Sequence, residues 1–317
     1  MKPVVTWKTI DDAAAGQRID NFLLTQLKGV PRSRVYRLIR KGEVRVNKKR
    51  IEQTYRLQLE DVVRIPPVQM DAEQLPVKLN DAVTARLNDS ILYEDDKLLI
   101  LNKPAGMAVH GGTGIQGGLI EYLREIRPQN KFLELAHRLD RDTSGCLMIA
   151  KSRAMLVELH ELLRDREVRK IYRVLVVGSW PKQVHKVDAP LQKNVLSSGE
   201  RIVKVAREGQ ESVTTFNVIE RFPAITLMEA FPHTGRTHQI RVHCACTGHP
   251  VVGDDRYGEG KINQELSKQL DSKRMFLHAY TLKLTIPSTG VEINVEAPLD
   301  DHWETAIRRA AHGRKVV

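Results

Sequence analysis

The sequence predicts an α+β protein, in which a small basic α/β domain precedes a larger domain with a mixed, largely antiparallel sheet. Three observations support this prediction. Residues 1–68 hold 15 Lys+Arg against 7 Asp+Glu, so they carry most of the net charge of +11. A stretch rich in proline and polar residues follows at 66–76. Beyond it, short apolar runs alternate with residues at helical spacing.

Length and composition agree with two folded domains. The 317 residues suffice for two domains of roughly 100 to 200 residues each. A composition of 41% hydrophobic and 28% charged residues is typical of a globular protein. We therefore place the small domain at 14–68, a linker at 69–88 and the large domain at 89–317.

The small domain is predicted to be helix, turn, helix and strand. Apolar residues at helical spacing mark the first helix: Ile19, Phe22, Leu23 and Leu27. A second such stripe follows: Val35, Leu38 and Ile39. We expect Gly29 and Gly42 to end these helices. Val44 and Val46 then alternate with charged residues, which predicts a strand before a basic turn at 47–50.

The large domain alternates strand and helix patterns. Strands are expected at the short apolar or alternating runs 98–101, 146–150, 172–177, 214–219, 225–230, 281–286 and 291–297. Ser152 can cap a helix whose leucine stripe reaches about Val168. The turn at 287–290 joins the last two strands as a hairpin. This succession predicts the mixed, largely antiparallel sheet.

The chain is expected to be cytoplasmic. No apolar run approaches the ~18 residues that span a bilayer, so no membrane segment is expected. Lys8, Asp11 and Asp12 precede any stretch resembling a signal peptide, which argues against export. Three cysteines, an odd number, indicate reduced thiols.

One face of the second predicted helix and the turn after it is basic: Arg32, Arg34, Arg37, Arg40, Lys41 and Lys48. A charge run of this kind can be no more than a solvated surface. Here the acidic residues lie elsewhere, and the whole chain has a pI near 9.6. The clustering therefore favours nucleic acid as the partner.

Two polar clusters of the large domain are candidates for chemistry. The first is His137-Arg138-Leu139-Asp140-Arg141-Asp142-Thr143-Ser144-Gly145, which directly precedes an expected buried strand and so has a rigid support. In the second, at 233–243, cationic and apolar residues alternate after Gly235, which predicts a strand whose arginines face phosphate or carboxylate. Taken singly, each cluster is also explained as an ion-paired strand end or an exposed basic strand.

The small domain resembles the alpha-L RNA-binding module, which a ribosomal small-subunit protein and tyrosyl-tRNA synthetases share. The resemblance covers about fifty residues and rests on Arg18-Ile19-Asp20-Asn21-Phe22-Leu23 and on the segment from Ser33-Arg34 to Val46-Asn47. It implies binding to structured RNA. The basic residues that would contact phosphate are Arg32, Arg34, Arg37, Arg40 and Lys48.

Nearly the whole chain resembles the cofactor-free pseudouridine synthases that act on large-subunit ribosomal RNA and on some tRNAs. Six motifs in the family's order carry the resemblance: Asn102-Lys103-Pro104-Ala105-Gly106, the cluster 137–145, Lys170-Ile171-Tyr172, Gly235-Arg236-Thr237-His238-Gln239-Ile240-Arg241, Gly253-Asp254-Asp255-Arg256-Tyr257-Gly258 and Arg274-Met275-Phe276-Leu277-His278-Ala279. Met275 replaces the commoner leucine, a conservative change. The resemblance implies isomerisation of specific uridines to pseudouridine in 23S ribosomal RNA.

The resemblance also assigns catalytic roles. Asp140 would be the catalytic aspartate, and Arg241 would pair with it and aim it. Tyr172 would stack on the flipped uracil, and it can receive a proton late in the reaction. Leu277 would form an apolar wall that keeps water away. Attack at the sugar, attack at the ring and proton abstraction by the carboxylate all remain open.

RNA contacts in the large domain are implied in the same way. Arg138 would fill the position that the flipped nucleotide leaves, and Lys103 and Arg236 would contact backbone phosphate. The isomerisation needs no nucleotide, metal or other cofactor. The family resemblance further implies a monomer.

Other sites and functions fit less well. The spacing of His243, Cys244, Cys246 and His249 does not match a zinc site, so no metal is expected. The glycine-rich segment 111–114 lacks the lysine and hydroxyl residue of a nucleotide-binding loop. A non-catalytic ribosome-associated RNA-binding factor would not need Asp140, Tyr172 and Arg241 together. A tRNA-directed synthase remains a second candidate within the enzyme class.

Overall fold

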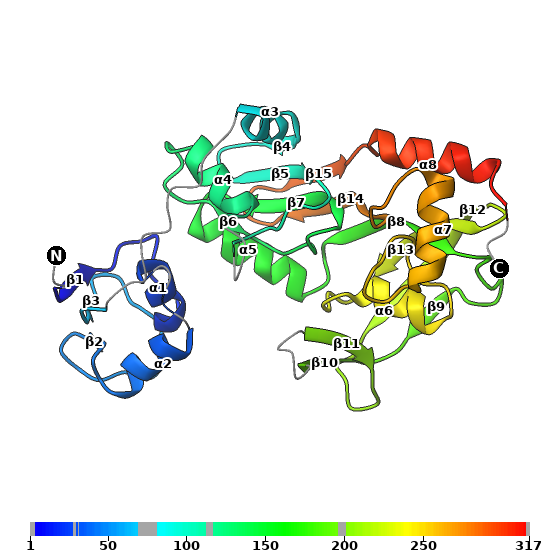
Figure 1. The fold of residues 1–317 in the computed structure, drawn as a ribbon. Coiled ribbons are helices and arrows are strands. Elements are labelled where there is room, and N and C mark those ends of the chain that lie inside the picture. The colour runs from blue at the N-terminus through cyan, green and yellow to red at the C-terminus, as the bar shows by residue number, and fades with distance from the viewer. Residues whose placement is uncertain are drawn as a thin grey trace.

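The computed structural model of the protein describes residues 4–27, 30, 32–68, 81–111, 117–195 and 201–314. Figure 1 shows the course of the chain through these segments. Elements are numbered along the chain. No helix in these ranges is long and apolar enough to cross a membrane.

The amino-terminal segment forms a three-stranded antiparallel sheet, in the order β1-β3-β2, with two helices. Its elements are β1 Thr6–Thr9, α1 Ile19–Gln26, α2 Arg32–Arg40, β2 Arg45–Val46 and β3 Val62–Ile65. The apolar stripes predicted for both helices are buried in a shared core. Gly42, at a φ of +71°, follows the second helix as predicted, and Gly29 lies outside the described residues. Strands β1 and β3 were not predicted.

Part of the expected linker is helical. Residues 69–80 lie outside the described residues, but α3 spans Asp81–Asp89. Its Leu87 is fully buried in the core of the large sheet. A helix this short is stabilised mainly by the packing of its leucine against the sheet. That contact joins distant parts of the chain, so the local sequence pattern did not predict the helix. The domain boundaries given above, 14–68 and 89–317, remain predictions.

The rest of the chain is organised around a sheet for which ten strands are described. Its main path runs β4-β5-β7-β14-β8-β13-β12-β9, while β15 pairs with β14 and β6 with β7. These strands are β4 Ile91–Glu94, β5 Leu98–Lys103, β6 Glu134–Leu135, β7 Ser144–Ala150, β8 Arg169–Val177, β9 Lys186–Asp188, β12 Val213–Arg221, β13 Ile225–Pro232, β14 Leu277–Ile286 and β15 Val291–Glu296. Strands β10 Leu191–Val195 and β11 Arg201–Val205 form a separate hairpin.

The helices of this region are α4 Leu119–Ile126, α5 Arg153–Arg164, α6 Gln239–Cys246, α7 Gly260–Leu270 and α8 Asp301–Ala311. Ser152 caps α5 as predicted, its hydroxyl accepting the amide of Met155 at 3.2 Å. The helix ends earlier than predicted, at Arg164, because the chain turns through Arg166 at a φ of +64° before β8 starts.

One strand pair divides the sheet into two antiparallel halves. Among the described pairs, only β7 and β14 run parallel, matching Ser144 to His278 and Gly145 to Ala279. We call these four residues the seam. Gly145 has a φ of +106°, and a Cβ there would lie 2.2 Å from the carbonyl oxygen of Ala279, so only glycine fits. The prediction of a mixed, largely antiparallel α+β fold is confirmed.

The prediction of a strand at 236–241 is wrong, because this segment enters helix α6. Ile240 and Cys244, four residues apart, pack into one core cluster. Arg241 and His243, which alternate with them in the sequence, are also buried. When both faces of a helix are covered, the residue pattern shows no helical period.

Candidate active site

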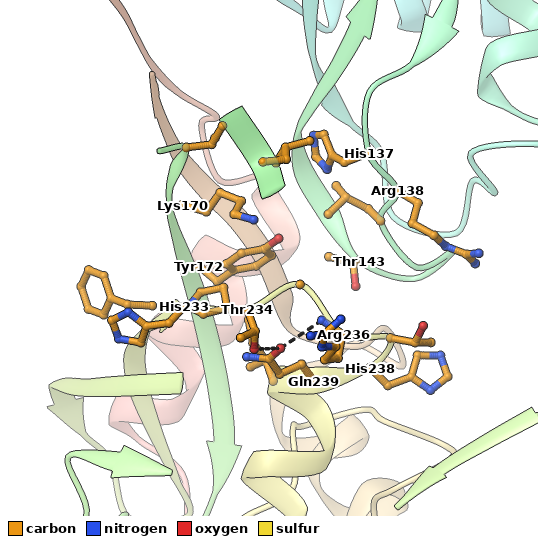
Figure 2. A pocket seen from close by; sticks show the side chains of 18 of the residues that line it. His137, Arg138, Thr143, Lys170, Tyr172, His233, Thr234, Arg236, His238 and Gln239 are labelled. Carbon is orange, nitrogen blue, oxygen red and sulfur yellow. Dashed lines mark hydrogen bonds between the residues drawn. The ribbon is translucent and has the colours of Figure 1, made fainter. Parts of the chain in front are cut away.

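A cleft of about 1120 Å³ opens beside the seam, and it is lined from both halves of the sheet. The loop before β7 contributes Asp140, β8 contributes Tyr172, and β14 begins with Leu277 at its wall. Helix α6 and the turn before it supply Arg236 and Arg241. The structure therefore brings together the four residues expected to form the catalytic set. In Figure 2, Arg138 lies on one side of the pocket and Tyr172 on the other.

Arg241 lies between two carboxylates at the base of this cleft. Its Nη1 donates to Asp140 Oδ2 at 2.9 Å. Its Nε and Nη2 donate to the two oxygens of Asp254, at 2.7 and 2.8 Å. Burial opposes the charge of Arg241, but the two carboxylates outweigh it and raise its pKa. A planar guanidinium bound on two edges holds a fixed direction, so it aims the Asp140 carboxylate into the cleft.

Asp254 owes its position to the turn before it. Gly253 has a φ of +75°, and a Cβ there would lie 2.0 Å from the carbonyl oxygen of Arg274. The turn directs Asp254 inward, where its Oδ1 also accepts the amides of Arg256 and Tyr257 at 3.0 and 3.1 Å. Burial opposes ionisation of Asp254, but Arg241 and these amides lower its pKa. Asp254 is therefore the buried anchor of the Arg241 side chain.

Tyr172 faces Asp140 across the cleft as a neutral phenol. It sits in the middle of β8, opposite Ala230 on one side and Ala279 on the other, so small neighbours leave its ring room. Burial raises the pKa of Tyr172, and the charge of Asp140 raises it further. The ring can stack on a planar base. A phenol that keeps its own proton cannot accept another, so the raised pKa of Tyr172 argues against the late proton uptake expected from the resemblance.

His238 approaches the second oxygen of Asp140. It precedes α6 with a left-handed φ of +55°, and its Nε2 lies 3.7 Å from Asp140 Oδ1. Its Nδ1 is hydrogen-bonded to the Tyr257 hydroxyl at 2.7 Å, and that hydroxyl accepts the amide of Val203 in β11 at 3.1 Å. Burial and the nearby arginines lower the pKa of His238 despite Asp140. The neutral ring therefore connects the β10–β11 hairpin to the carboxylate.

The expected phosphate contacts in the large domain have two different placements. Arg138 and Arg236 are exposed and line the cleft, with Arg236 Nε donating to the Glu211 carbonyl at 3.1 Å. Lys103 is 0% exposed. Its Nζ donates to the carbonyls of Pro104, Met107 and Arg141 at 2.8, 2.8 and 2.9 Å.

The assignment of Lys103 to phosphate is therefore corrected, because the side chain holds the loop that carries Asp140. Burial lowers the pKa of Lys103 to about 7, with the nearby Asp142 and Asp140 acting against it. Like the two aspartates, the three carbonyl oxygens favour the charged ammonium form of Lys103 and so oppose the effect of burial. A lysine with all three N–H donors engaged inside the protein cannot reach a backbone phosphate.

The basic residues of the amino-terminal segment lie on α2 and the turn after β2. Arg37, Arg40 and Lys48 are exposed, and Arg34 is half-buried. Arg32 begins α2, but its side chain lies outside the described residues. The charge cluster expected from the sequence is therefore on the surface at the positions described.

Sequence reasoning missed Asp254, His238 and Tyr257 as members of the site. All three belong to motifs that carried the family resemblance, which was the available signal. Their roles depend on contacts with residues far along the chain, so the local pattern did not reveal them. Among the described residues, no group of three or more His, Cys, Asp and Glu side chains is arranged to hold a metal ion.

Comparison with known proteins agrees with this geometry. The model of the family described as RNA pseudouridylate synthase matches residues 97–246, and that of the S4 domain matches 17–63. Ribosomal large subunit pseudouridine synthase C of Escherichia coli (strain K12) is 52% identical over 314 residues, 98% of each chain. The protein of that name from Salmonella typhimurium is 56% identical over 289 residues, 90% of this chain and 91% of its own.

A solved structure shares the fold. Human RNA pseudouridylate synthase domain containing 4 aligns with a TM-score of 0.61 and 26% identity, over 73% of this chain and 96% of its own. Identity of 52% along almost the full length, together with both domain matches, decides the family. The chain belongs to the RNA pseudouridylate synthase family, as an isomerase with an amino-terminal S4 domain.

Proposed function

We propose that this enzyme isomerises specific uridines of 23S ribosomal RNA to pseudouridine, with Asp140 as its catalytic carboxylate. The observation that supports this most directly is the Asp140–Arg241 pair, at 2.9 Å, in a cleft shared with Tyr172. The choice of RNA follows from the names of the relatives, which are ribosomal large subunit pseudouridine synthases. The S4 domain and its basic helix supply a surface for such a substrate.

The reaction balances within the nucleotide. The N1–C1′ bond breaks, the uracil turns, and a C5–C1′ bond forms. C5 loses its proton, and N1 gains one. Since no atom or electron is added, the chemistry requires neither a redox partner nor a group donor. We propose that the enzyme acts without a cofactor and as a monomer.

The residues around the cleft would divide the work. Asp140 acts on the sugar or the ring as nucleophile or base, and Arg241 keeps it aimed. Tyr172 stacks on the uracil, and Leu277, which is buried, excludes water from the separated base and sugar. Arg138, exposed at the cleft, would occupy the space that the flipped nucleotide leaves.

The decisive test is Asp140→Asn, which keeps the shape of the side chain and removes its charge. We expect RNA binding to persist and product formation to be lost. Release of tritium from uridine labelled at C5 measures turnover, because that hydrogen leaves in every productive cycle. Asp142→Asn is the matched control, since Asp142 lies on the same loop in an exposed pair with Arg141 and should leave turnover intact.

Several outcomes would overturn the proposal. Wild-type turnover by Asp140→Asn would place the catalytic group elsewhere. Loss of wild-type activity with a chelator, restored only by metal, would contradict the cofactor-free reaction. Maps of pseudouridine with and without the enzyme that differ only in tRNA would favour a tRNA-directed synthase. RNA binding with no isomerisation of any RNA would favour a non-catalytic binding factor.

A further inference from the structure

The outer face of the amino-terminal sheet carries one aromatic residue and two arginines in a row. Trp7 of β1 pairs in register with Arg64 of β3, and Arg64 pairs with Arg45 of β2. Residues in register across a sheet project from the same face. The neighbouring Val63 and Val46 are buried in the core, so the row lies on the opposite face, toward solvent.

This row is an unusual surface for a small domain. Trp7 is 52% exposed, although an indole of this size is seldom left in water without a partner. Strand β1 precedes residues 17–63, which match the S4 domain, and so does Trp7. The tryptophan therefore adds an aromatic surface at the edge of this sheet, outside the matched domain.

The two arginines are held in place by the chain after α2. Arg45 Nε donates to the carbonyl of Gly42 at 3.2 Å, and Arg64 Nη1 donates to the carbonyl of Glu43. Each contact uses one of the five N–H donors of a guanidinium and anchors it near the end of the helix that carries Arg40. The row is thus continuous with the basic residues of α2.

We propose that the Trp7–Arg64–Arg45 row binds an unpaired segment of the substrate RNA, with a base stacked on Trp7 and phosphates held by Arg64 and Arg45. The inference rests on the proposed RNA substrate. Every nucleobase offers a planar face to an indole, and guanidinium groups pair with phosphate, so such a row suits single-stranded RNA. The two arginines on one side of Trp7 favour this polyanion over an apolar protein partner.

The tryptophans of the chain provide a direct probe. Trp180 and Trp303 are 2% and 0% exposed, so Trp7 is the one that a ligand in solution can reach. Titration of the full-length enzyme with a short oligouridylate should quench its tryptophan fluorescence, and a fully paired RNA duplex should quench it much less. In Trp7→Phe the quenching should disappear. Its affinity for labelled oligouridylate should stay near wild type, because a phenyl ring still stacks.

Affinity and salt dependence separate stacking from charge. Trp7→Ala should weaken binding of oligouridylate about 5- to 150-fold, the range for loss of one stacked base, with an unchanged slope of log K against log salt. Arg64→Gln and Arg45→Gln should each reduce that slope by about 0.7. Leu59→Ala is the control, since Leu59 is 54% exposed in the same domain but outside the row, and its affinity should not change.

The outcomes distinguish this inference from the proposed function. If the enzyme forms pseudouridine but oligouridylate neither quenches Trp7 nor binds more weakly to Trp7→Ala, the row is not an RNA site. An equal drop in affinity in Leu59→Ala would indicate a general apolar surface, suited to a protein partner, and would also overturn the inference. If RNA quenches Trp7 but no RNA is isomerised, the proposed function fails while the row stands.

Discussion

At the scale of single residues, the site depends on how one buried cation is shared. Arg241 is a buried guanidinium, and burying its charge without a partner would destabilise the fold. Asp254 accepts hydrogen bonds from two N–H groups of Arg241. Asp140 therefore need not neutralise Arg241 alone. Its carboxylate receives a single hydrogen bond from Arg241 and keeps its other oxygen toward His238.

This arrangement predicts a strong effect of Asp254→Asn. The substitution leaves Arg241 buried with only Asp140 as a charged partner, so we expect the protein to lose about 3 to 5 kcal/mol of stability. The value of kcat should fall more than KM rises, because Arg241 then aims Asp140 poorly. Urea unfolding and tritium-release kinetics measure the two effects. Asp255→Asn, at the exposed neighbouring position, should change neither, and equal behaviour of the two variants would contradict this role.

The sequence was sufficient to identify Asp140, Tyr172, Arg241 and Leu277 as residues that meet in the cleft, but not the supporting roles of His238 and Asp254 or the position of Lys103. Asp140, Tyr172, Arg241 and Leu277 share motifs whose order along the chain carries the resemblance. A lysine followed by Pro-Ala-Gly looks the same whether it reaches solvent or points inward. Its burial follows from the pairing of Lys103 with Gly145 across β5 and β7, a contact between distant residues.

At the scale of elements, the longer strands of the large sheet were predicted, whereas helix α6 and the strands β1, β3, β4, β6, β9, β10 and β11 were not. Runs such as 98–101 and 146–150 are buried on both faces, and their apolar character alone distinguishes them. Helix α6 carries polar residues inward because Arg241 binds carboxylates and His243 binds the Thr214 hydroxyl at 2.9 Å. A functional helix of this kind lacks the apolar stripe on which sequence reasoning depends.

The seam predicts loss of stability in mild acid. His278 Nε2 donates to the Ala297 carbonyl, so its Nδ1 accepts the Ser144 hydroxyl at 2.8 Å. Burial lowers the pKa of His278 to about 4, and Arg274 acts in the same direction. An unfolded histidine takes up its proton near pH 6.5, so the folded state loses stability as the pH falls from there toward 4. The loss should reach about 3 kcal/mol.

Urea unfolding at a series of pH values measures this effect. His278→Gln cannot titrate, so its stability should fall less steeply than that of the wild type over the same interval. Parallel curves for the two proteins would show that the acid sensitivity arises elsewhere, for example at His137, whose pKa burial lowers to about 3.

Two glycines with positive φ should respond differently to substitution, because Gly145 lies in the seam and Gly106 does not. In Gly106→Ala, only the φ of +81° opposes the substitution, since no atom lies within 4 Å of the new Cβ. The free energy of unfolding should therefore fall by about 1 to 2 kcal/mol. Gly145→Ala adds a collision with the Ala279 carbonyl, which is backbone and cannot move aside. We expect a considerably larger loss in urea unfolding. An equal loss of unfolding free energy in the two variants would mean that β7 and β14 can move apart at Gly145 without loss of stability.

At the scale of the whole molecule, the amino-terminal segment has a core of its own. Its buried cluster contains only residues between Ile10 and Val68, and the remaining clusters contain none of these. A domain with a separate core can be removed without exposing the interior of the rest. The residues proposed to be catalytic all lie beyond it.

Deletion of residues 1–68 should therefore weaken RNA binding and leave the chemistry intact. Removing each phosphate-binding side chain should change the slope of log K against log salt by about 0.7 to 0.9. Turnover of a saturating small RNA should change little. Filter binding at several salt concentrations and tritium release are the measurements. An unchanged salt slope would show that the basic helix is only a solvated surface.

The central place of β14 has a consequence for the order in which the protein is made. The strand begins at Leu277, near the end of the chain, yet it lies between β7 and β8, which do not pair with each other. A nascent chain that ends before this strand cannot join the two halves of the sheet. Asp140 lies on the loop before β7 in one half, and Arg241 lies on α6, which packs against β12 and β13 of the other. The proposed catalytic pair can thus be assembled only after strand β14 has been synthesised, and a nascent chain that stops before Leu277 should be inactive.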